Sequence, residues 1–393
     1  MAKRSVAKVS LKGAKSLRAG NPWCYRTELL EPPEVGVAGA VVDVADPQGN
    51  PIGQALYARK SPLALRLLTR KSSQEERVDD AFFEARLKAA LDRRQSLAQR
   101  DAYRLVHGES DLLPGLLVDK YGTGLSLQTL SEGMDARKES LGKMLAKLTS
   151  ATHVVCRDDH SGRDFEQLPR EKKLLIGSAP AKASFHEGQN RYEVDLLEDM
   201  KTGGFLDQVD NHVRAGELAH GEALDTFSYH GGFALALSTK CSSVLAVEQD
   251  EAAAARAMEN AKQNGRTNVK VERGNAFDLL HAFDKDGKRF DTVVIDPPAF
   301  AKRREGLKSA LRAYHELNYR ALRLLRPNGL FVTCSCSGKL SREAFEEMVL
   351  SAASDAKRTL ALLERRGAGI DHPPLVTLPE TEYLKAFFYR VLA

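Results

Sequence analysis

A carboxylate and two thiols follow apolar runs in the last third of this chain. Asp296 comes directly after residues 293–295, and Cys334 and Cys336 come shortly after residues 329–332. Such runs are typical of buried strands, and in an open α/β sheet the carboxyl ends of neighbouring parallel strands line one crevice. An acid beside a thiol in that crevice predicts covalent chemistry on a bound substrate.

The two cysteines lie two residues apart on a segment predicted to be extended, so their side chains should share one side with Ser335 opposite. A buried cysteine is usually an inert small apolar residue, and only a thiolate in a polar, electropositive setting is a nucleophile. Two prolines restrict the backbone after Asp296, which suits a carboxylate that recognises a base but also an ordinary strand end. Spacing alone does not decide whether the cysteines are inert or reactive, nor whether Asp296 recognises a base or only ends a strand.

Two further acids end predicted strands upstream. Asp225 precedes a turn that contains Gly231, and Glu248 ends the apolar run 244–247. Such a turn lets backbone amides approach a nucleotide-like ligand, and a carboxylate at the next strand end can accept the hydroxyl hydrogens of a ribose. The turn lacks the GxGxxG spacing of dinucleotide sites. Singly, each acid is more often a helix cap or a solvated charge, but together they predict a nucleoside cofactor.

The chain divides into three predicted domains. Residues 1–75 form a small β-rich unit with a predicted hairpin, in which residues 40–44 and 51–57 flank a Pro-Gly-Asn turn. Residues 76–182 open with charged residues and a predicted helix around 82–91, and continue as a mixed α+β segment. Residues 183–393 alternate strands and helices, which predicts an α/β domain with a parallel sheet and helices on both faces.

Composition limits the class of protein. The 393 residues carry a formal net charge of +5, and the five cysteines are scattered without a CxxC pair or a neighbouring histidine cluster. Neither a disulfide framework nor a metal site is indicated. No run has the length and apolarity of a signal peptide or a membrane span, so we expect a cytoplasmic protein.

The start of the chain is basic, since no acidic residue precedes Glu28. Basic residues concentrated in this way attract phosphate backbones. A solvated basic face explains the pattern equally well. The basic residues singled out are Lys8, Lys12, Lys15 and Arg18.

In their order, these motifs resemble those of class I S-adenosylmethionine-dependent methyltransferases, and nearly the whole chain resembles the bacterial large-subunit ribosomal RNA methyltransferase I family. The resemblance is carried by residues 20–23, 104–106, 113–119, 201–208, 225–233, 296–298, 335–338, 371–373 and 383–385. It implies an N-terminal PUA domain, a small α+β central domain and a Rossmann-like catalytic domain with a seven-stranded, mostly parallel sheet. A late strand over residues 386–392 would close that sheet in an antiparallel hairpin.

The resemblance also places the cofactor, S-adenosylmethionine. Glu248 would hold the ribose, and Asn275 stands at the adenine-side position, which is usually acidic in the family. An amide can still meet the adenine edge because it both donates and accepts hydrogen bonds. The implied cofactor residues are Phe205, Asp207, Gln208, Asp225, Phe227, Ser228, Tyr229, Gly231, Glu248, Asn275, Ala276 and Asp296.

The reaction implied by the resemblance is 5-methylation of a cytidine in 23S ribosomal RNA. Cys336 is the implied nucleophile, because it lies seven positions after Gly329, as in the wider RNA cytosine-5 group. Its thiolate would add to carbon 6 and make carbon 5 able to take the methyl group, while Asp296 steadies the ring. The base that removes the carbon 5 proton stays open, since Ala299 replaces the cysteine that follows the two prolines in the wider group.

The implied partner is 23S ribosomal RNA, free of protein or partly assembled, with the target cytosine unpaired or flipped out of its helix. Trp23, in the part that resembles a PUA domain, would join the basic residues in RNA binding, and a homodimer stays open. Two alternatives are kept. One is methylation of a guanine ring nitrogen, which needs no thiol, and the other is a catalytically idle RNA-binding protein of the same fold.

Overall fold

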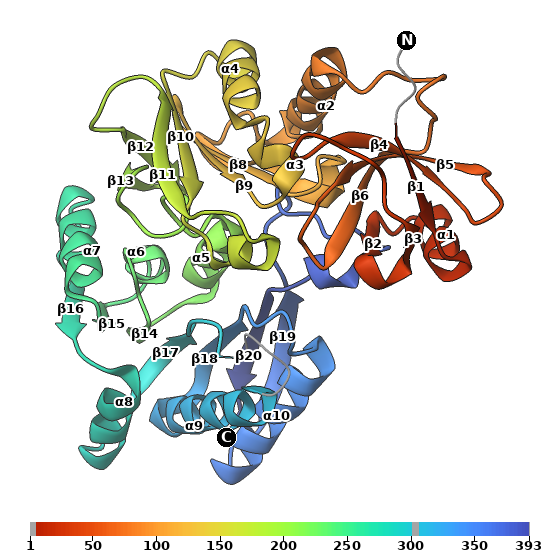
Figure 1. Ribbon diagram of the computed structural model, residues 1–393. Helices are drawn as coiled ribbons and strands as arrows, with labels where there is room; N and C mark the ends of the chain where they lie inside the picture. The colour runs from red at the N-terminus through yellow and green to blue at the C-terminus, as the bar shows by residue number, and fades with distance from the viewer. Residues whose placement is uncertain (1–4, 301–305, 393) are drawn as a thin grey trace. The chain divides into compact units, whose positions relative to one another are not determined.

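The computed structural model describes residues 5–300 and 306–392. Its contacts group the chain into two compact units (Figure 1). Unit 1 consists of Met1–Phe185, Glu193–Phe205 and Asp371–Pro379, and unit 2 of His186–Tyr192, Leu206–Ile370 and Glu380–Ala393. The boundaries of the three predicted domains, 1–75, 76–182 and 183–393, stay a prediction.

The first part of unit 1 is a six-stranded sheet in the order β2-β6-β5-β4-β1-β3, within the residues that the structure describes. The predicted hairpin is confirmed, since β4 and β5 pair antiparallel with Val41 opposite Leu56. The elements are β1 (Val6–Val9), α1 (Leu11–Arg18), β2 (Trp23–Tyr25), β3 (Leu29–Glu31), β4 (Val41–Ala45), β5 (Pro51–Tyr57) and β6 (Leu63–Thr69).

The second part of unit 1 is a five-stranded sheet in the order β11-β10-β9-β8-β7. The predicted helix is α2, which buries Phe82, Phe83, Leu87 and Ala90 and begins at an N-cap of Asp79 that accepts from the Phe82 amide. The elements are α2 (Asp80–Arg93), β7 (Ala102–His107), β8 (Leu116–Tyr121), β9 (Gly124–Thr129), α3 (Glu132–Asp135), α4 (Lys138–Thr149), β10 (His153–Asp158) and β11 (Glu171–Ile176).

Several short elements connect these parts. A two-stranded sheet pairs β12 (Lys182–Glu187) with β13 (Asn190–Asp195). The single-turn helices are η1 (Arg26–Glu28), η2 (Gln95–Leu97), η3 (Gly108–Asp111), η4 (Ser161–Glu166), η5 (Leu206–Gln208) and η7 (Pro379–Thr381).

Unit 2 is built, over its described residues, on a seven-stranded sheet in the order β16-β15-β14-β17-β18-β20-β19. The first five strands are parallel to their neighbours, and β20 runs antiparallel to both β18 and β19. The expected antiparallel closure by the last strand is therefore confirmed. The strands are β14 (Glu222–Thr226), β15 (Ser243–Glu248), β16 (Val269–Arg273), β17 (Phe290–Ile295), β18 (Leu325–Ser335), β19 (Leu360–Arg366) and β20 (Lys385–Val391).

Helices cover both faces of this sheet, because successive apolar side chains of β17 point to opposite faces and each face must be buried. Val293 and Ile295 pack in a core with α8, α9 and α10, whereas Val294 packs on the opposite face with α5 and α6. In Figure 1, α8, α9 and α10 lie together on one side of β17 and β18. The helices are α5 (Val209–Leu218), α6 (Gly232–Leu237), α7 (Glu251–Gln263), α8 (Ala276–Lys285), α9 (Leu307–Leu324) and α10 (Arg342–Asp355).

The late segment Asp371–Pro379 groups with unit 1 although it follows strands of unit 2 in sequence. The Asp371 carboxylate accepts from the Arg104 amide at 2.7 Å, and the Arg94 guanidinium donates to the Asp371 carbonyl at 3.1 Å. The Thr377 hydroxyl donates to the Gly20 carbonyl at 2.8 Å. Hydrogen bonds to buried, charged groups therefore hold this segment in unit 1.

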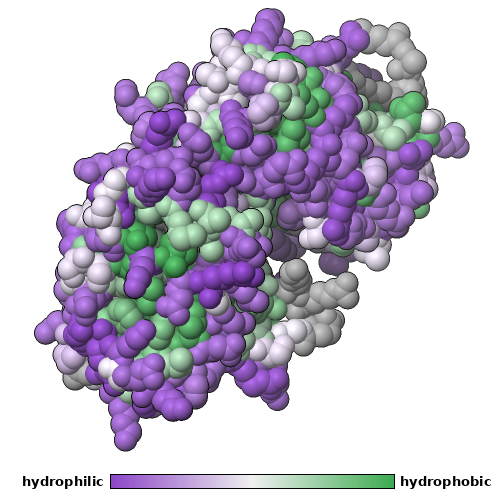
Figure 2. Space-filling model, turned by 90° about the vertical axis from the view of Figure 1, so that its left-hand side faces the viewer, coloured by the Kyte–Doolittle hydropathy of each residue, from purple (hydrophilic) through white to green (hydrophobic). Residues whose placement is uncertain are grey.

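The surface seen in Figure 2 is mainly hydrophilic with separate apolar areas. The exposed large apolar side chains come from many elements, among them Leu11, Phe165, Met258, Leu350 and Val376. No helix in the described ranges is long and apolar enough to cross a membrane.

We expect Leu317→Ala to lower the free energy of unfolding of unit 2 by about 2–5 kcal/mol, because it removes a fully buried side chain of α9 and leaves a cavity. The matched control is Leu350→Ala, whose side chain on α10 is 54% exposed, and it should change stability by less than about 0.5 kcal/mol. Urea unfolding followed by circular dichroism measures both. Equal losses in the two variants would contradict the assigned core.

Candidate active site

Four strand ends of unit 2 meet at one level of the sheet. Thr226 pairs with Val247 on one side and with Ile295 on the other, and Ile295 pairs with Thr333. The residue after each paired position therefore lies at the same edge of the sheet, where β14 and β17 have ended and β15 and β18 are at or near their last residue. These four residues are Phe227, Glu248, Asp296 and Cys334. The register thus brings together the carboxylates and the thiol segment that the sequence placed at strand ends.

The loop after β14 bends sharply before α6. Phe227, Tyr229 and Gly231 all have positive φ, at 61°, 48° and 87°. The Ser228 amide donates to the Val247 carbonyl at 3.0 Å, which fastens the loop to β15. A Cβ on Gly231 would lie 2.8 Å from the side chain of Leu235, so this turn needs glycine for conformation and for space.

Asp225 is buried beneath this loop. Neither oxygen of its carboxylate has a hydrogen-bond partner among the residues that the structure describes, and the Ser228 hydroxyl donates to the Asp225 carbonyl instead. Burial raises the pKa of Asp225 to about 7. Unpaired buried carboxylate oxygens are costly, so they point to a ligand that supplies donors or a positive charge.

Glu248 organises the neighbouring strand end. Its carboxylate accepts from the amides of Tyr229, Gln249 and Asp250 at 2.8, 2.8 and 2.9 Å. These bonds fix the carboxylate in one orientation. Oε1 accepts two of them, whereas Oε2 accepts one and has a lone pair for a further hydrogen bond. The half-buried position suits the predicted recognition of ribose hydroxyl groups.

A buried histidine lies under the start of α6. A Cβ on Gly232 would lie 2.4 Å from the His212 ring, so only glycine allows this approach. His212 Nδ1 lies 2.8 Å from the Glu187 carboxylate, and the His212 ring packs edge-on against Phe233. Burial lowers the pKa of His212, but the Glu187 carboxylate outweighs it, so the pKa of the imidazole is raised overall. The Glu187 carboxylate therefore favours the protonated form of this imidazole.

A chain of amides leads to Asp296. The Gln208 side chain donates to the Asp296 carboxylate at 3.1 Å, and the Asn211 side chain donates to the Gln208 oxygen at 2.6 Å. The Arg366 guanidinium donates to the Asn211 oxygen at 2.9 Å. This network holds Gln208 with its amide nitrogen toward Asp296, so the carboxylate is oriented before any substrate arrives.

Asp207 and Asn275 are also anchored. The Tyr383 hydroxyl donates to the Asp207 carboxylate at 2.7 Å, and the Gly369 amide donates to the Asp207 carbonyl at 3.1 Å. Asn275 is the N-cap of α8, where its side chain accepts from the Phe277 amide at 2.9 Å, and Ala276 beside it is buried. The side chain of Asn275 therefore has a structural partner as well as its predicted role toward adenine.

Phe205, the remaining predicted cofactor residue, belongs to unit 1. There the Lys201 ammonium lies 3.7 Å from the centre of its ring, within the range of a cation–π interaction. Its role toward the cofactor stays a prediction.

The two cysteines differ in environment. Cys334 is completely buried, and burial followed by the charge of Asp296 raises the pKa of its thiol well above the ordinary value. Such a thiol is a poor nucleophile at neutral pH. Cys336 lies just past the end of β18 and is half-buried. The structure therefore favours Cys336 as the reactive thiol.

Hydroxyl groups flank Cys336. Ser335 donates to the Tyr314 hydroxyl at 2.9 Å, and the Ser337 hydroxyl lies 3.0 Å from the same oxygen. Sequence reasoning missed Tyr314, Asn211 and His212, whose residue types are ordinary in helices. Tyr383 and Lys385 did stand out as a motif, but without a role. Only their positions opposite the thiol segment and beside Asp207 could have shown that they belong to the site.

The predicted RNA-binding residues lie in unit 1. Trp23 donates through Nε1 to the Glu109 carboxylate at 2.9 Å. Three of the basic residues form ion pairs, which offset part of their positive charge. These pairs are Lys8–Glu31 at 3.0 Å, Lys12–Glu28 at 2.9 Å and Arg18–Asp46 at 2.8 Å. Their role toward RNA stays a prediction.

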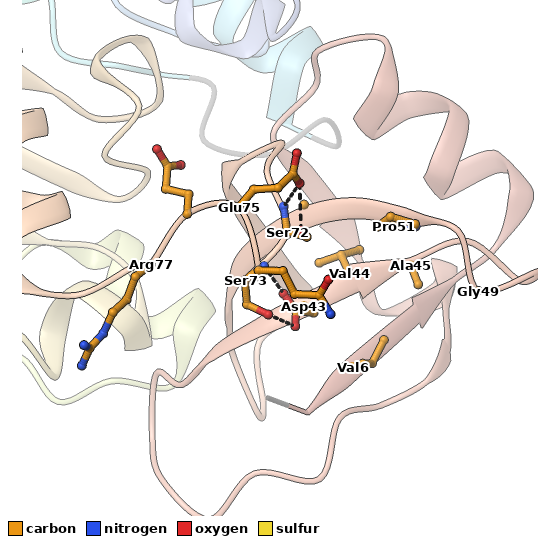
Figure 3. A pocket seen from close by; sticks show the side chains of 13 residues that line it. Val6, Asp43, Val44, Ala45, Gly49, Pro51, Ser72, Ser73, Glu75 and Arg77 are labelled. Atoms are coloured by element: carbon orange, nitrogen blue, oxygen red, sulfur yellow. Dashed lines mark hydrogen bonds between the residues drawn. The ribbon is translucent and has the colours of Figure 1, made fainter. Parts of the chain in front are cut away.

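A groove beside β4 and β5 of unit 1 has an acidic lining (Figure 3). The Ser73 hydroxyl donates to Asp43 at 2.6 Å and the Ser72 hydroxyl donates to Glu75 at 2.8 Å. Arg77 points away from these groups in Figure 3. Carboxylates repel phosphate groups, so this groove does not suit an RNA backbone.

One cluster of acids outside the site has metal-like spacing. The side-chain oxygens of Asp135, Asp158 and Glu171 lie within 4.8 Å of one another. The Lys138 ammonium pairs with all three acids, and Arg163 pairs with Asp158 at 3.0 Å and Asp135 at 2.8 Å. Cations of the protein itself therefore neutralise this cluster.

Comparisons with known proteins agree with this architecture. A PUA-like domain model matches residues 8–70, and a methyltransferase domain model matches residues 219–367. The chain is 35% identical over 386 residues to a ribosomal RNA large subunit methyltransferase I of Yersinia pestis bv. Antiqua (strain Angola), across 96% of this chain and 97% of that relative.

Solved structures share the fold. One, described as an S-adenosylmethionine-dependent methyltransferase from Streptococcus mutans, has a TM-score of 0.83 at 20% identity, across 98% of this chain and 100% of that chain. Another, described as a methyltransferase complexed with SAH, has a TM-score of 0.83 at 19% identity over the same shares. At such identity the likeness concerns the fold alone. The expected class I methyltransferase fold with an N-terminal PUA-like domain is confirmed.

We expect Asp225→Asn to change how stability depends on pH. An aspartate whose pKa is raised from about 3.9 to about 7 binds more protons folded than unfolded, so stability falls as pH rises between these values. The full shift corresponds to an upper bound on the order of 4 kcal/mol. Asparagine cannot ionise. The free energy of unfolding of the variant minus that of the wild type should therefore be larger at pH 8 than at pH 5, since only the wild type loses stability as the pH rises.

Urea unfolding at the two pH values measures this difference, and the wild type at each pH is the control. The same difference at both pH values would show that Asp225 ionises normally in the folded protein.

Proposed function

The chain belongs to the ribosomal RNA large subunit methyltransferase I family, and on that basis we propose that it methylates carbon 5 of a cytidine in 23S ribosomal RNA through a covalent adduct with Cys336. The family predicted from the motifs is confirmed. The protein is a methyltransferase whose cofactor is S-adenosylmethionine.

The residues at the strand ends fit this cofactor. Asp225 offers two carboxylate oxygens, unpaired among the described residues, to a cationic group, and Glu248 offers its oriented Oε2 to a ribose hydroxyl. The loop from Asp225 to Gly231 would wrap the ligand, and Asn275 would meet the adenine edge. When bound, S-adenosylmethionine supplies an electrophilic methyl group on a sulfonium.

The observation that carries the proposal is the contrast between the two thiols. Only Cys336 is partly accessible at the carboxyl edge of the sheet, while Cys334 is buried with a raised pKa. A cytosine carbon 5 is a poor nucleophile, so its methylation needs prior addition of a nucleophile at carbon 6. A half-buried thiol that follows β18, the strand next to the one that ends at the oriented carboxylate, answers that need.

In the proposed reaction, the Cys336 thiolate forms a bond from Sγ to carbon 6, and the electron pair of the carbon 5–carbon 6 double bond moves to carbon 5 and into the ring. Carbon 5 then bonds to the methyl group as the bond from the methyl carbon to sulfur breaks. A base removes the remaining carbon 5 proton, and the electron pair restores the double bond as the bond to Sγ breaks.

Asp296 would hold the ring through the exocyclic amine and ring nitrogen. Gln208 fixes one of its oxygens at 3.1 Å, which orients the carboxylate. A fixed carboxylate stabilises developing charge without reorganising during the reaction. Either Asp296 or water could accept the carbon 5 proton, since Ala299 offers no thiol for this step.

The PUA-like domain supports an RNA substrate, bound by shape and by phosphate contacts. A paired base cannot reach a thiol at a sheet edge, so we propose that the target is unpaired or flipped, in RNA that is free of protein or partly assembled. A cytoplasmic location and a homodimer stay predictions.

We expect Cys336→Ala to reduce methyl transfer to deproteinised 23S ribosomal RNA by at least about a thousandfold, because the adduct cannot form. The matched control is Cys334→Ala, which removes a thiol two positions away and should retain activity within about tenfold. Transfer of labelled methyl followed by nucleoside analysis gives both the rate and the product, expected to be 5-methylcytidine.

Several outcomes would contradict the proposal. Label in a methylated guanosine, with both cysteine variants active, would establish the guanine alternative. Binding of RNA and cofactor without any transfer by the wild type would indicate a catalytically idle RNA-binding protein.

We expect Glu248→Gln to weaken binding of S-adenosylhomocysteine by about tenfold or more, because a neutral amide replaces a charged acceptor of ribose hydroxyls. Glu251→Gln is the control, since that carboxylate lies nearby on α7 and is paired with Arg273 at the surface. Isothermal titration calorimetry measures both affinities. Unchanged affinity in Glu248→Gln would remove Glu248 from the cofactor site.

A further inference from the structure

Lys385 is a buried lysine at the start of β20. It is 2% exposed and pairs with Ser335 across the antiparallel ladder of β18 and β20. Its Nζ donates to three main-chain carbonyls, those of Ser337 at 2.8 Å, Leu340 at 2.9 Å and Tyr383 at 2.8 Å. An ammonium has three donors, so these bonds use all of its hydrogen atoms.

This arrangement closes the turn that follows Cys336. Two of the three carbonyls, those of Ser337 and Leu340, belong to the turn itself, and the third belongs to the segment that leads into β20. Two bonds from one buried cation to the turn, and a third to the neighbouring segment, restrict the turn more than contacts with water would. The position of Cys336 therefore depends on Lys385.

Lys385 also carries its charge close to the thiol. Burial lowers the pKa of Lys385 to about 8, and the negative charge of Cys336 acts against that effect. Arg342 lowers the pKa further and Glu382 raises it. Glu382 is itself paired with the Arg342 guanidinium at 2.5 Å, so these two surface charges largely offset each other. A buried lysine without an acidic partner in the described ranges is costly, which makes a thiolate a fitting counter-charge.

A phenol and two hydroxyl groups lie beside the thiol segment. There Tyr314 of α9 bonds to the hydroxyls of Ser335 and Ser337, and burial raises the pKa of its phenol, as does the charge of Cys336. Cys334 is buried and its thiol resists ionisation, and Asp296 adds negative charge. The charge of Lys385, in contrast to these groups, favours a thiolate.

We propose that Lys385 is a positioning residue for Cys336, holding the turn of residues 336–340 through its contacts with the Ser337 and Leu340 carbonyls and stabilising the Cys336 thiolate with its charge. This inference rests on the proposed role of Cys336 as the nucleophile. Lys385 keeps its protons during the reaction, and the thiol proton passes to solvent. The same charge favours the thiolate again as leaving group when the product is released.

The test is the pH dependence of alkylation of Cys336 by iodoacetamide in the full chain, resolved by peptide mass spectrometry. In Lys385→Met, we expect the pH of half-maximal rate to rise by about one unit or more, because a nearby opposite charge has been removed. In Lys385→Arg, which retains the charge, the pH of half-maximal rate should move by less than about half of the shift expected for Lys385→Met. Lys339→Met, which removes an exposed lysine of the same turn, is the matched control and should not move the profile.

Two measurements keep the test decisive if Lys385→Met does not fold, as judged by circular dichroism. Lys385→Gln retains a donor for the turn without charge and should show the same upward shift. The wild type alone should react with a half-maximal pH below about 8.5, the value of an unperturbed thiol. A wild-type value above this, or folded variants with an unshifted profile, would overturn the proposal.

Alkylation uses neither RNA nor cofactor, so the two proposals fail separately. Methyl transfer that persists in Cys336→Ala would remove the nucleophile but leave the effect of Lys385 on the thiol standing. An unshifted profile together with inactive Cys336→Ala would remove the role of Lys385 and leave the nucleophile standing.

Discussion

The site depends on the register of four parallel strands. Because Thr226 pairs with both Val247 and Ile295, and Ile295 pairs with Thr333, the last residues of β14, β15 and β17 are aligned with the carboxyl-terminal part of β18, which runs on to Ser335. Backbone hydrogen bonds of the sheet thereby set the spacing between groups that are far apart in sequence. A slip of one residue in any of these strands would turn its side chains to the opposite face and separate the acids from the thiol.

Around this edge the protein buries polar groups at a cost to stability. The buried Asp225 carboxylate has no hydrogen-bond partner in the described residues, and the buried His212 imidazole contacts Glu187 under the start of α6. Groups of this kind are retained where a ligand meets them, since a bound ligand repays their desolvation. The apolar core on the α9 side, centred on residues such as Leu317, supplies the stability that offsets this cost.

Burial also separates two thiols that are almost adjacent in sequence. Cys334 points into the packed face of the sheet with α5 and α6, where the low dielectric favours the neutral thiol. Cys336 lies one residue beyond the end of β18, in a turn bounded by Tyr314 and Lys385. The position of the strand end therefore places one cysteine in the core and leaves the other partly accessible.

Local pattern in the sequence determined the order of strands and helices, the acids at strand ends and the glycine turn before α6, because apolar period and turn chemistry are short-range properties. The same pattern, read with its motifs, led to the methyltransferase family and its closing strand. Tertiary structure decided which cysteine is buried, how Gln208 and Asn211 orient Asp296, and that Asp371–Pro379 groups with unit 1. It also placed Lys385 against the turn of residues 336–340, which contains Cys336. These features rest on pairing and packing between distant segments, which no local pattern specifies.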